Sequence, residues 1–184
     1  MSFFDSHLKD SESLFIDEIA LDPDYVPKFI KFRENQQQQI ADIIKVLLKK
    51  RTATNIFLTG SPGIGKTLSV LHILRELQEK GLDEQIYPIY INCWKKDTAH
   101  KIVSEICSKL NYRFTINKTT DQLINDISKI INQKSAVFVL DEIDKIESSA
   151  IDIVYHLLEG ILRKSVILIT NNRNFLTEID PRIL

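Results

Sequence analysis

The sequence contains little cysteine, glycine or proline, and it has no long apolar run. Two cysteines, five glycines and five prolines among 184 residues make a disulfide framework or a loop-dominated fold unexpected. Cys93 and Cys107 have no metal-ligand spacing, and we expect both to be buried small hydrophobic residues in a reducing compartment. No apolar stretch reaches the roughly 18–20 residues that a membrane span requires, and residues 1–10 lack a signal-peptide pattern. Secretion and a membrane partner are therefore not expected.

An excess of one charge sign is also missing. The 24 Lys and Arg residues balance 25 Asp and Glu residues, for a net charge of −1, which gives no global basic field that could hold a nucleic acid. Any DNA partner therefore requires a local basic patch or a segment outside these residues. With 43% hydrophobic residues, the length suits one globular domain. We expect a flexible segment at 1–12 and a single domain at 13–184.

Short apolar runs alternate with helical stripes along the chain. Continuous β-branched runs predict strands, buried on both faces, at residues 55–59, 86–93, 136–140 and 165–170. Between them, apolar residues recur three and four apart, and two such helices, near 98–110 and 120–133, separate the second strand from the third. This alternation predicts an α/β fold, a three-layer sandwich with a mostly parallel central sheet.

A glycine-rich motif follows the first predicted strand and opens the next helix. It reads Gly60-Ser61-Pro62-Gly63-Ile64-Gly65-Lys66-Thr67 and matches the P-loop pattern. The glycines allow successive backbone N–H groups to face phosphates, and the helix N-terminus adds partial positive charge. Lys66 is predicted to reach the β- and γ-phosphates and Thr67 to hold Mg²⁺. A glycine-rich turn without a ligand has no need of Lys66-Thr67 at this offset. The predicted nucleotide contacts are Ser61, Pro62, Gly63, Ile64, Gly65, Lys66, Thr67 and Leu68.

Two carboxylates end the third predicted strand. Asp141 and Glu142 follow four apolar residues, at the strand edge where ligands bind in doubly wound sheets. Asp141 is predicted to support the Mg²⁺ site with Thr67, and Glu142 to orient and polarise the water that attacks the γ-phosphate. The alternative is a solvated acidic cap. For Asp144 and Lys145, which follow, a surface ion pair is the better interpretation.

An asparagine follows the fourth predicted strand. An amide at this place can hydrogen-bond both the γ-phosphate and the attacking water, and Asn171 is favoured over Asn172 because it comes first. A plain turn is the alternative for residues 172–174. The predicted catalytic residues are thus Lys66, Glu142 and Asn171.

Three further segments carry a resemblance to a known family. They are Leu21-Asp22-Pro23-Asp24-Tyr25-Val26-Pro27 followed by Phe32-Arg33-Glu34, the strand end Tyr90-Ile91-Asn92-Cys93, and Asp180-Pro181-Arg182-Ile183. With the two nucleotide motifs, they make the sequence resemble the AAA+ ATPase domain of archaeal and eukaryotic replication initiators of the origin-recognition and cell-division-control type. The resemblance runs in family order from about Ser13 to the end of the chain and implies the P-loop AAA+ sandwich.

The resemblance also implies a function. It implies an ATP-binding and ATP-hydrolysing switch domain, using ATP or ADP with Mg²⁺, in an initiator that recognises origins and helps to load the replicative helicase. Its implied partners are origin DNA, the replicative helicase and other initiator subunits, on the chromosome in an archaeal-like cytoplasm or in a eukaryotic nucleus. Adenine contacts are implied for Tyr25, Val26, Pro27 and Arg33, although the same residues suit an extended lead-in and a helix cap.

The initiator subgroup carries an extra helix after the second strand that touches DNA. The corresponding region here is 94–101, in which Lys95, Lys96 and Lys101 are candidate DNA contacts. The competing interpretation, favoured in general for a charged helix entry, is a solvated face. A lowered salt dependence of DNA binding on mutation would distinguish the two.

The sequence also departs from the family pattern. The family's fifth strand, its helical lid with a second sensor arginine, and its winged helix are not recognised in the 184 residues. We therefore expect an AAA+ domain truncated at its C-terminal end, with slow or no hydrolysis by itself. Arg182 is a candidate for the arginine that faces a neighbouring subunit's nucleotide, where such a residue raises the rate by about 10³–10⁵.

Other functions remain open from the sequence. A clamp loader, a helicase loader or another remodelling ATPase would share the fold. A P-loop phosphotransferase for a small molecule is disfavoured by Asp141-Glu142 and the asparagine after the fourth strand, and a non-hydrolysing scaffold is disfavoured by the intact motifs.

Overall fold

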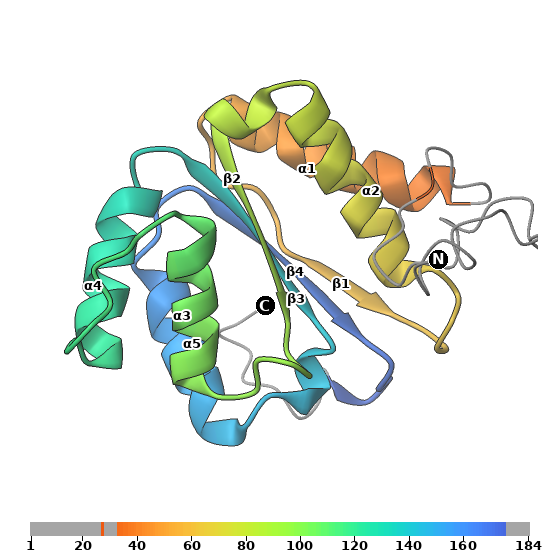
Figure 1. The fold of residues 1–184 in the computed structure, drawn as a ribbon. Helices are drawn as coiled ribbons and strands as arrows, with labels where there is room; N and C mark the ends of the chain where they lie inside the picture. Colours follow the sequence, from red (N-terminus) through yellow and green to blue (C-terminus); the bar gives the residue numbers. More distant parts are fainter. Residues whose placement is uncertain (1–26, 28–32, 176–184) are drawn as a thin grey trace, which may run out of the picture.

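The computed structural model describes Pro27 and residues 33–175, which alternate between helices and strands (Figure 1). The strands are β1 (Ile56–Thr59), β2 (Ile86–Asn92), β3 (Ser135–Asp141) and β4 (Lys164–Thr170). The helices are α1 (Glu34–Leu48), α2 (Lys66–Glu79), α3 (Ala99–Lys109), α4 (Thr120–Ile131) and α5 (Ser148–Glu159), with two 3₁₀ helices, η2 (Leu82–Glu84) and η3 (Ile143–Lys145). The predicted flexible segment 1–12 lies outside the described residues.

The four strands form one sheet in the order β1-β4-β3-β2, and each neighbouring pair is parallel. The α/β fold with a parallel sheet is therefore confirmed, and the strand ends differ from the predicted ones by one residue. The two predicted helices between β2 and β3 are also present, as α3 and α4. Because the strands are parallel, their carboxyl ends meet at one edge of the sheet.

Helices cover both faces of the sheet and make a three-layer sandwich. Figure 1 shows α1 and α2 on one face and α3, α4 and α5 on the other. Strand β3 is buried along its whole length because alternate side chains enter the two cores. Phe138 and Leu140 pack with α3, α4 and α5, whereas Val137 and Val139 pack with α1 and α2.

Helix α4 illustrates how local signals and packing agree. Its N-terminus has a capping box, in which the Thr119 hydroxyl accepts from the Gln122 backbone N–H and the Gln122 side chain accepts from the Thr119 N–H. Leu123, Ile127 and Ile131 follow at intervals of four and are fully buried against the sheet. The amphipathic stripe therefore fixes which face of α4 meets the core.

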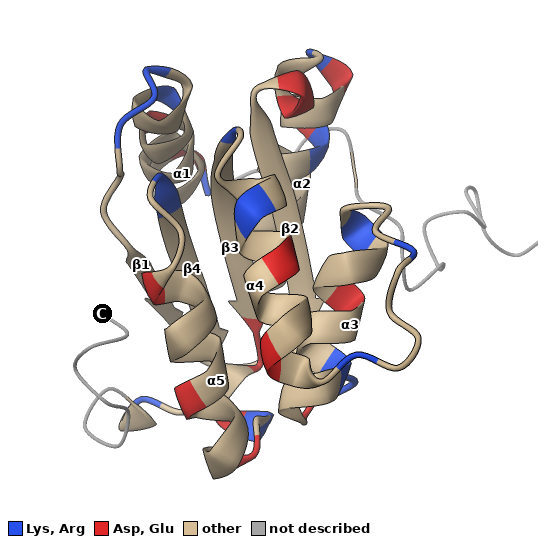
Figure 2. Ribbon diagram, turned by 90° about the vertical axis from the view of Figure 1, so that its left-hand side faces the viewer, with Lys and Arg blue, Asp and Glu red and all other residues tan. Residues whose placement is uncertain are grey.

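Both cysteines are buried and free, as predicted. Burial, reinforced by the negative charge of Asp141, raises the pKa of the Cys93 thiol to about 12, so it remains a protonated, unreactive group. No helix in the described part of the chain is long and apolar enough to cross a bilayer. Basic and acidic residues occur together on the helices on either side of the sheet, as Figure 2 shows.

Candidate nucleotide-binding site

A cavity of about 330 Å³ lies at the carboxyl edge of the sheet, between the loop after β1 and the ends of β3 and β4. It is lined by Pro62, Gly63, Gly65, Lys66, Thr67, Leu68, Asp141, Glu142, Ile169, Thr170 and Asn171. The fold thus brings the glycine-rich motif, the acidic pair and the asparagine, which are far apart in the sequence, to one place. Ser61 and Ile64 belong to the same loop but are not among the lining residues.

The glycine-rich loop has the backbone conformation that its sequence predicts. Gly63 and Gly65 have φ angles of 76° and 85°, in the left-handed region that favours glycine. Gly65 is the N-cap of α2, so the helix begins at Lys66, and its first residues Lys66, Thr67 and Leu68 line the cavity. No acidic residue occupies the first turn of α2. The loop therefore offers N–H groups and a helix N-terminus to an anion.

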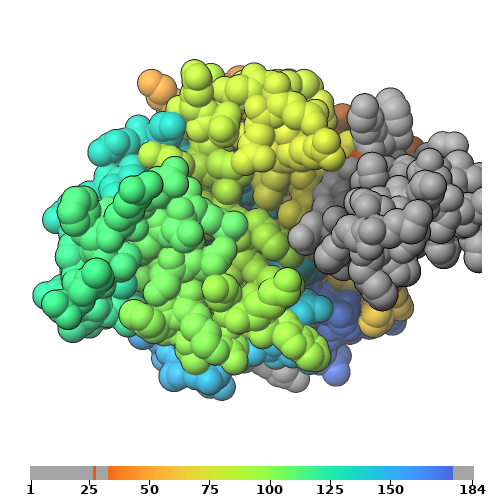
Figure 3. All heavy atoms as spheres, in the orientation of Figure 1, coloured from red at the N-terminus to blue at the C-terminus, as the bar shows by residue number. Residues whose placement is uncertain are grey.

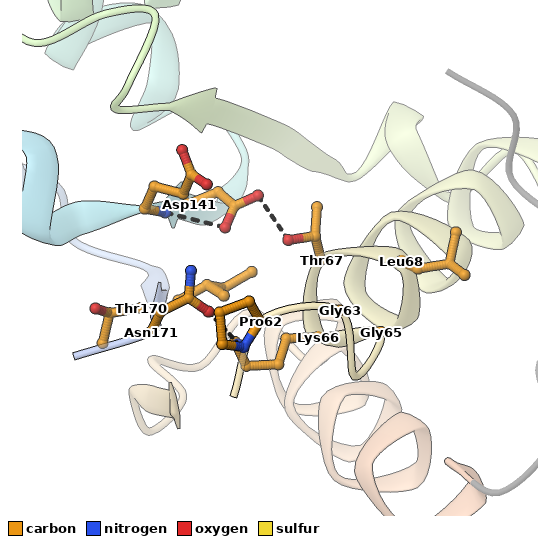
Figure 4. Close-up of a pocket in the computed structure, with 11 residues that line it drawn as sticks. Pro62, Gly63, Gly65, Lys66, Thr67, Leu68, Asp141, Thr170 and Asn171 are labelled. Atoms are coloured by element: carbon orange, nitrogen blue, oxygen red, sulfur yellow. Dashed lines mark hydrogen bonds between the residues drawn. The ribbon is translucent and has the colours of Figure 1, made fainter. Parts of the chain in front are cut away.

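The Lys66 ammonium has three oxygen partners. Its Nζ donates to the carbonyl oxygens of Gly60 and Ser61, at 2.8 and 3.0 Å, and to Oδ1 of Asn171, at 2.7 Å. Burial lowers the pKa of the Lys66 ammonium, and the charge of Asp141 opposes that shift. The hydrogen bond between Lys66 and Asn171 links the loop to the end of β4 (Figure 4).

Asp141 is a buried carboxylate with three hydrogen-bond donors. Its Oδ2 accepts from Thr67 Oγ1 and from the Tyr90 hydroxyl, both at 2.8 Å, and its Oδ1 accepts from the Glu142 backbone N–H at 3.0 Å. Figure 4 shows the Asp141 and Thr67 side chains pointing toward each other across the cavity. Burial raises the pKa of Tyr90 above its ordinary value, and the charge of Asp141 adds to this, so the hydroxyl remains a donor.

Glu142 adopts a backbone conformation that is uncommon for its residue type. Its φ and ψ angles are 54° and 45°, in the left-handed region, at the junction between β3 and η3. Such conformations cost on the order of 1 kcal/mol or more and cluster at functional sites. Partial burial raises the pKa of the Glu142 carboxyl, and the nearby charges of Asp141 and Asp144 raise it further. A carboxylate of raised basicity at the cavity wall is suited to accept a proton.

The end of β4 is tied to the segment after β3. Thr170, which lines the cavity, donates from Oγ1 to Asp144 Oδ1 at 2.5 Å, and Thr170 Oγ1 accepts from the Asn172 backbone N–H. Lys145 forms the predicted ion pair with Asp144 at 3.1 Å. These contacts fix the turn that follows Thr170 and so fix the position of Asn171.

The predicted adenine contacts fall partly outside the described residues. Tyr25 and Val26 lie outside the described residues. Arg182, the candidate arginine for a neighbouring subunit's nucleotide, also lies outside them. Pro27 is half-buried. Arg33 donates from Nη2 to the Ile64 carbonyl at 2.5 Å and so contacts the glycine-rich loop.

None of the three candidate DNA contacts is among the residues that line the cavity. Lys96 pairs with Glu105 at 3.1 Å and Lys101 with Asp97 at 2.7 Å, whereas Lys95 is exposed. The segment that contains them is lime-green in Figure 3 and lies at the molecular surface beside the edge strand β2. Two of the three lysines are thus partly neutralised by local carboxylates.

The donor set at the cavity fits a magnesium ion. Mg²⁺ is usually held by one or two protein oxygen ligands together with phosphates and water. The Thr67 hydroxyl and the buried Asp141 carboxylate meet at 2.8 Å beside the phosphate-binding loop, and both are hard oxygen donors. Within the described residues there is no cluster of three or more His, Cys, Asp or Glu side chains of the kind that binds a metal by protein ligands alone.

Sequence reasoning missed two residues of this site. Tyr90 reaches Asp141 from the neighbouring strand, and Thr170 lines the cavity and fixes Asp144. Tyr90 was part of the family resemblance, but its contact depends on the pairing of β2 with β3. The one sequence signal for Tyr90 was its place as a polar side chain two residues before the end of β2.

The parallel three-layer fold and the glycine-rich loop define a P-loop domain of the ATPase type. The sequence profile of the AAA domain family matches residues 49–174, which is more than half of the chain. The chain therefore belongs to the AAA domain family.

Among individual proteins, the chain is similar to ORC1-type DNA replication proteins. The chain is 31% identical over its whole length to an ORC1-type DNA replication protein 1 of Archaeoglobus fulgidus and covers 47% of that protein. It is 33% identical to the protein of the same name from Sulfurisphaera tokodaii, over 92% of this chain and 45% of that protein. The chain thus spans just under half the length of these curated relatives.

Two solved structures of archaeal ORC1 and Cdc6 proteins share the fold of this chain. Aeropyrum pernix ORC1, solved in complex with DNA, superposes with a TM-score of 0.76 at 26% identity, over 89% of this chain and 45% of that one. Cdc6p of Pyrobaculum aerophilum shares the fold with a TM-score of 0.74 at 24% identity, over 90% of this chain and 46% of that one. The predicted resemblance to AAA+ domains of replication initiators is confirmed.

Proposed function

We propose that the chain is the ATP-binding and ATP-hydrolysing switch domain of a DNA replication initiator. One observation carries the nucleotide part of this proposal. Lys66 and Thr67 of the glycine-rich loop meet Asp141, Glu142 and Asn171 at a single cavity. The replication part is supported by the ORC1-type relatives.

The glycine-rich loop and Lys66 bind the phosphates. Backbone N–H groups at the start of α2 face the phosphate oxygens, and the Lys66 ammonium exchanges its contacts with loop carbonyls for the β- and γ-phosphates. Thr67 and Asp141 would hold Mg²⁺, which would neutralise negative charge on the phosphates. Pro27 and Arg33 extend the site toward the base, and the contact of Arg33 with the Ile64 carbonyl supports this for Arg33.

Glu142 and Asn171 act on the attacking water. Glu142 orients the water and accepts its proton, a role for which its raised pKa suits it. Asn171 hydrogen-bonds the γ-phosphate through its Nδ2 amide, because a phosphate oxygen can only accept, while its Oδ1 accepts from the Lys66 ammonium at 2.7 Å. The state of the third phosphate is thereby linked to the position of the β4 end. Arg182 faces the nucleotide of a neighbouring subunit in an assembly, and hydrolysis by the single chain is slow.

In the whole protein this switch controls the recognition of origin DNA and the loading of the replicative helicase. DNA as a partner is supported by a relative, since the Aeropyrum pernix ORC1 structure contains DNA. Within the described part of this chain, Lys95, Lys96 and Lys101 are the candidate DNA contacts.

Nucleotide binding tests the first half of the proposal. Titration of ATP in Mg²⁺ should saturate the wild-type chain, and nucleotide at about 100 times its Kd should stabilise the fold by about 2.7 kcal/mol, or roughly 5–10 °C in Tm. Lys66→Ala should weaken binding at least about tenfold, since charge-assisted contacts are worth about 1.5–3 kcal/mol each. Lys45→Ala, on the exposed face of α1, is the matched control. Unchanged binding by Lys66→Ala would contradict the proposed site.

Turnover tests the second half. Glu142→Gln should retain nucleotide binding and lose about 10²–10⁴-fold of any measurable phosphate release. Release that is undiminished in this variant would exclude Glu142 as the base.

A further inference from the structure

Asp141 is oriented by a residue outside both nucleotide motifs. Its Oδ2 accepts hydrogen bonds from Thr67 Oγ1 and from the Tyr90 hydroxyl, each at 2.8 Å. Its Oδ1 accepts from the Glu142 backbone N–H at 3.0 Å. Two of these donors come from the chemistry-bearing segments themselves, whereas Tyr90 comes from β2.

The sheet register explains how Tyr90 reaches this carboxylate. Tyr90 is paired with Val139 and Asn92 with Asp141, so these four side chains share one face of the sheet. Side chains in strands lean along the strand, and the long tyrosine side chain spans the two-residue offset toward Asp141. The ring packs beside the core formed by α1, α2 and the sheet, which holds the hydroxyl in place.

A tyrosine in this half-buried position requires a partner for its hydroxyl. Leaving a buried hydroxyl unpaired costs about 1–3 kcal/mol, and a phenylalanine would fill the same apolar space without that requirement. The Tyr90 hydroxyl meets this requirement by donating to Asp141, and the Asn92 side chain hydrogen-bonds the same hydroxyl.

The donors differ in what happens to them when metal binds. Thr67, as a proposed ligand of Mg²⁺, would give an oxygen lone pair to the metal. The Tyr90 hydroxyl is a donor to Asp141 that is not itself a proposed ligand. A donor that stays on the carboxylate holds it in one orientation before and after metal binding, and such outer partners typically contribute 10–100-fold to metal affinity or activity.

We infer that Tyr90 is a positioning residue for the magnesium site, which fixes the Asp141 carboxylate for metal binding through its hydroxyl. The inference rests on the proposed nucleotide function. It assigns a role in the site to β2, one of the two edge strands of the described sheet, which carries none of the nucleotide motifs.

The test measures the Mg²⁺ dependence of nucleotide binding in Tyr90→Phe. The concentration of Mg²⁺ that gives half of the metal-dependent gain in ATP affinity should rise about tenfold or more. ATP affinity in EDTA should be unchanged. Mn²⁺ binding to the protein–nucleotide complex, followed by electron paramagnetic resonance, should weaken in parallel.

Tyr87→Phe is the matched control. Tyr87 lies on the same strand and packs against the opposite core, with the Lys134 Nζ 4.8 Å from its ring centre. This variant also loses a tyrosine hydroxyl, and its Mg²⁺ dependence should equal that of the wild type. Tyr90→Met, which removes the hydroxyl with a flexible apolar side chain, should reproduce the shift of Tyr90→Phe.

The outcomes separate the two proposals. If the wild type binds ATP with an Mg²⁺ dependence that Tyr90→Phe and Tyr90→Met leave unaltered, the role of Tyr90 is refuted and the proposed function stands. If both variants lose affinity equally in Mg²⁺ and in EDTA, Tyr90 supports the cavity as a whole, and the positioning role is again refuted. If the wild type binds no nucleotide, the proposed function fails and this inference fails with it.

Discussion

At the scale of single residues, the site concentrates charges that oppose one another. Asp141, Glu142 and Asp144 lie within four positions of the chain, and their mutual repulsion, added to burial, raises the pKa of Glu142. The same segment places Glu142 in the left-handed backbone region. Both features are unfavourable for the folded chain, and both are features of a carboxylate placed for proton transfer.

The raised pKa of Glu142 predicts a pH-dependent stability difference. The folded state holds the Glu142 proton to a higher pH than the unfolded state, so stability is lost as pH rises from the ordinary glutamate pKa of about 4.3 through the raised value. Glu142→Gln cannot ionise and escapes this loss. We expect the variant to have a higher Tm than the wild type at pH 7, with the difference vanishing near about pH 4. Thermal melts of the two proteins across this range provide the measurement, and a difference that grows on acidification would contradict the assignment.

At the scale of elements, the start of α2 depends on backbone conformation rather than on contacts. A Cβ atom added at Gly65 would meet no atom within 4 Å, so space does not explain the glycine. Its φ angle of 85° does.

Two glycine-to-alanine substitutions isolate this effect. Gly65→Ala should destabilise the nucleotide-free chain by about 1–2 kcal/mol, because alanine is strained in the left-handed region. Gly160→Ala, at the end of α5 with φ of −71°, should be neutral or stabilising by up to about 1 kcal/mol, since its added Cβ meets its neighbours at 3.5 Å or more. Urea unfolding measures both. Equal effects at the two positions would show that the left-handed conformation is not what Gly65 provides.

The packing of α4 on the sheet gives a second prediction at this scale. Ile127 is fully buried among the residues of the α3–α4–α5 layer, and Ile127→Ala should cost about 2–5 kcal/mol. Ile116 precedes the same helix and is 83% exposed, so Ile116→Ala should change stability by less than about 0.5 kcal/mol. Denaturant midpoints at constant m-value report both changes. Comparable losses of stability in the two variants would mean that Ile116, in the α3–α4 connection, is buried by packing rather than exposed.

At the scale of the whole molecule, positive and negative charges nearly balance, so the sequence has no overall excess of basic residues to attract a nucleic acid. The net charge is −1, and Lys96 and Lys101 are engaged by Glu105 and Asp97. Any electrostatic attraction to DNA from this region therefore depends on few unpaired charges. Lys95 is the exposed member of the group.

DNA binding by the chain should reflect this arrangement. If the segment 94–101 contacts phosphates, Lys95→Ala should lower the slope of log K against log salt by about 1 and weaken binding to all duplex sequences alike. Lys45→Ala should leave the slope unchanged. Fluorescence anisotropy with labelled duplex at several salt concentrations makes the comparison. An identical slope in the wild type and Lys95→Ala would assign this segment to the solvated face that is the competing interpretation.

Much of the architecture was predictable because its signals are local. The runs at β3 and β4 are continuous and β-branched, and the stripe of α4 repeats at helical spacing, so each element was readable from a short window. The glycine-rich loop was equally readable, because Gly65 and Lys66-Thr67 stand at fixed offsets after β1. Even the meeting of Lys66, Asp141 and Asn171 follows from the rule that parallel strands end at one edge.

What the sequence determined by itself was therefore the class of fold, the phosphate-binding loop and the acidic pair, since these depend on residue type and spacing along the chain. Only the tertiary structure decided which groups touch. The hydrogen bond of Tyr90 to Asp141 depends on the register of two strands some fifty residues apart. The hydrogen bond of Lys66 to Asn171 depends on the pairing of β1 with β4. Strand register and strand pairing arise from packing of the whole core, which no local pattern encodes.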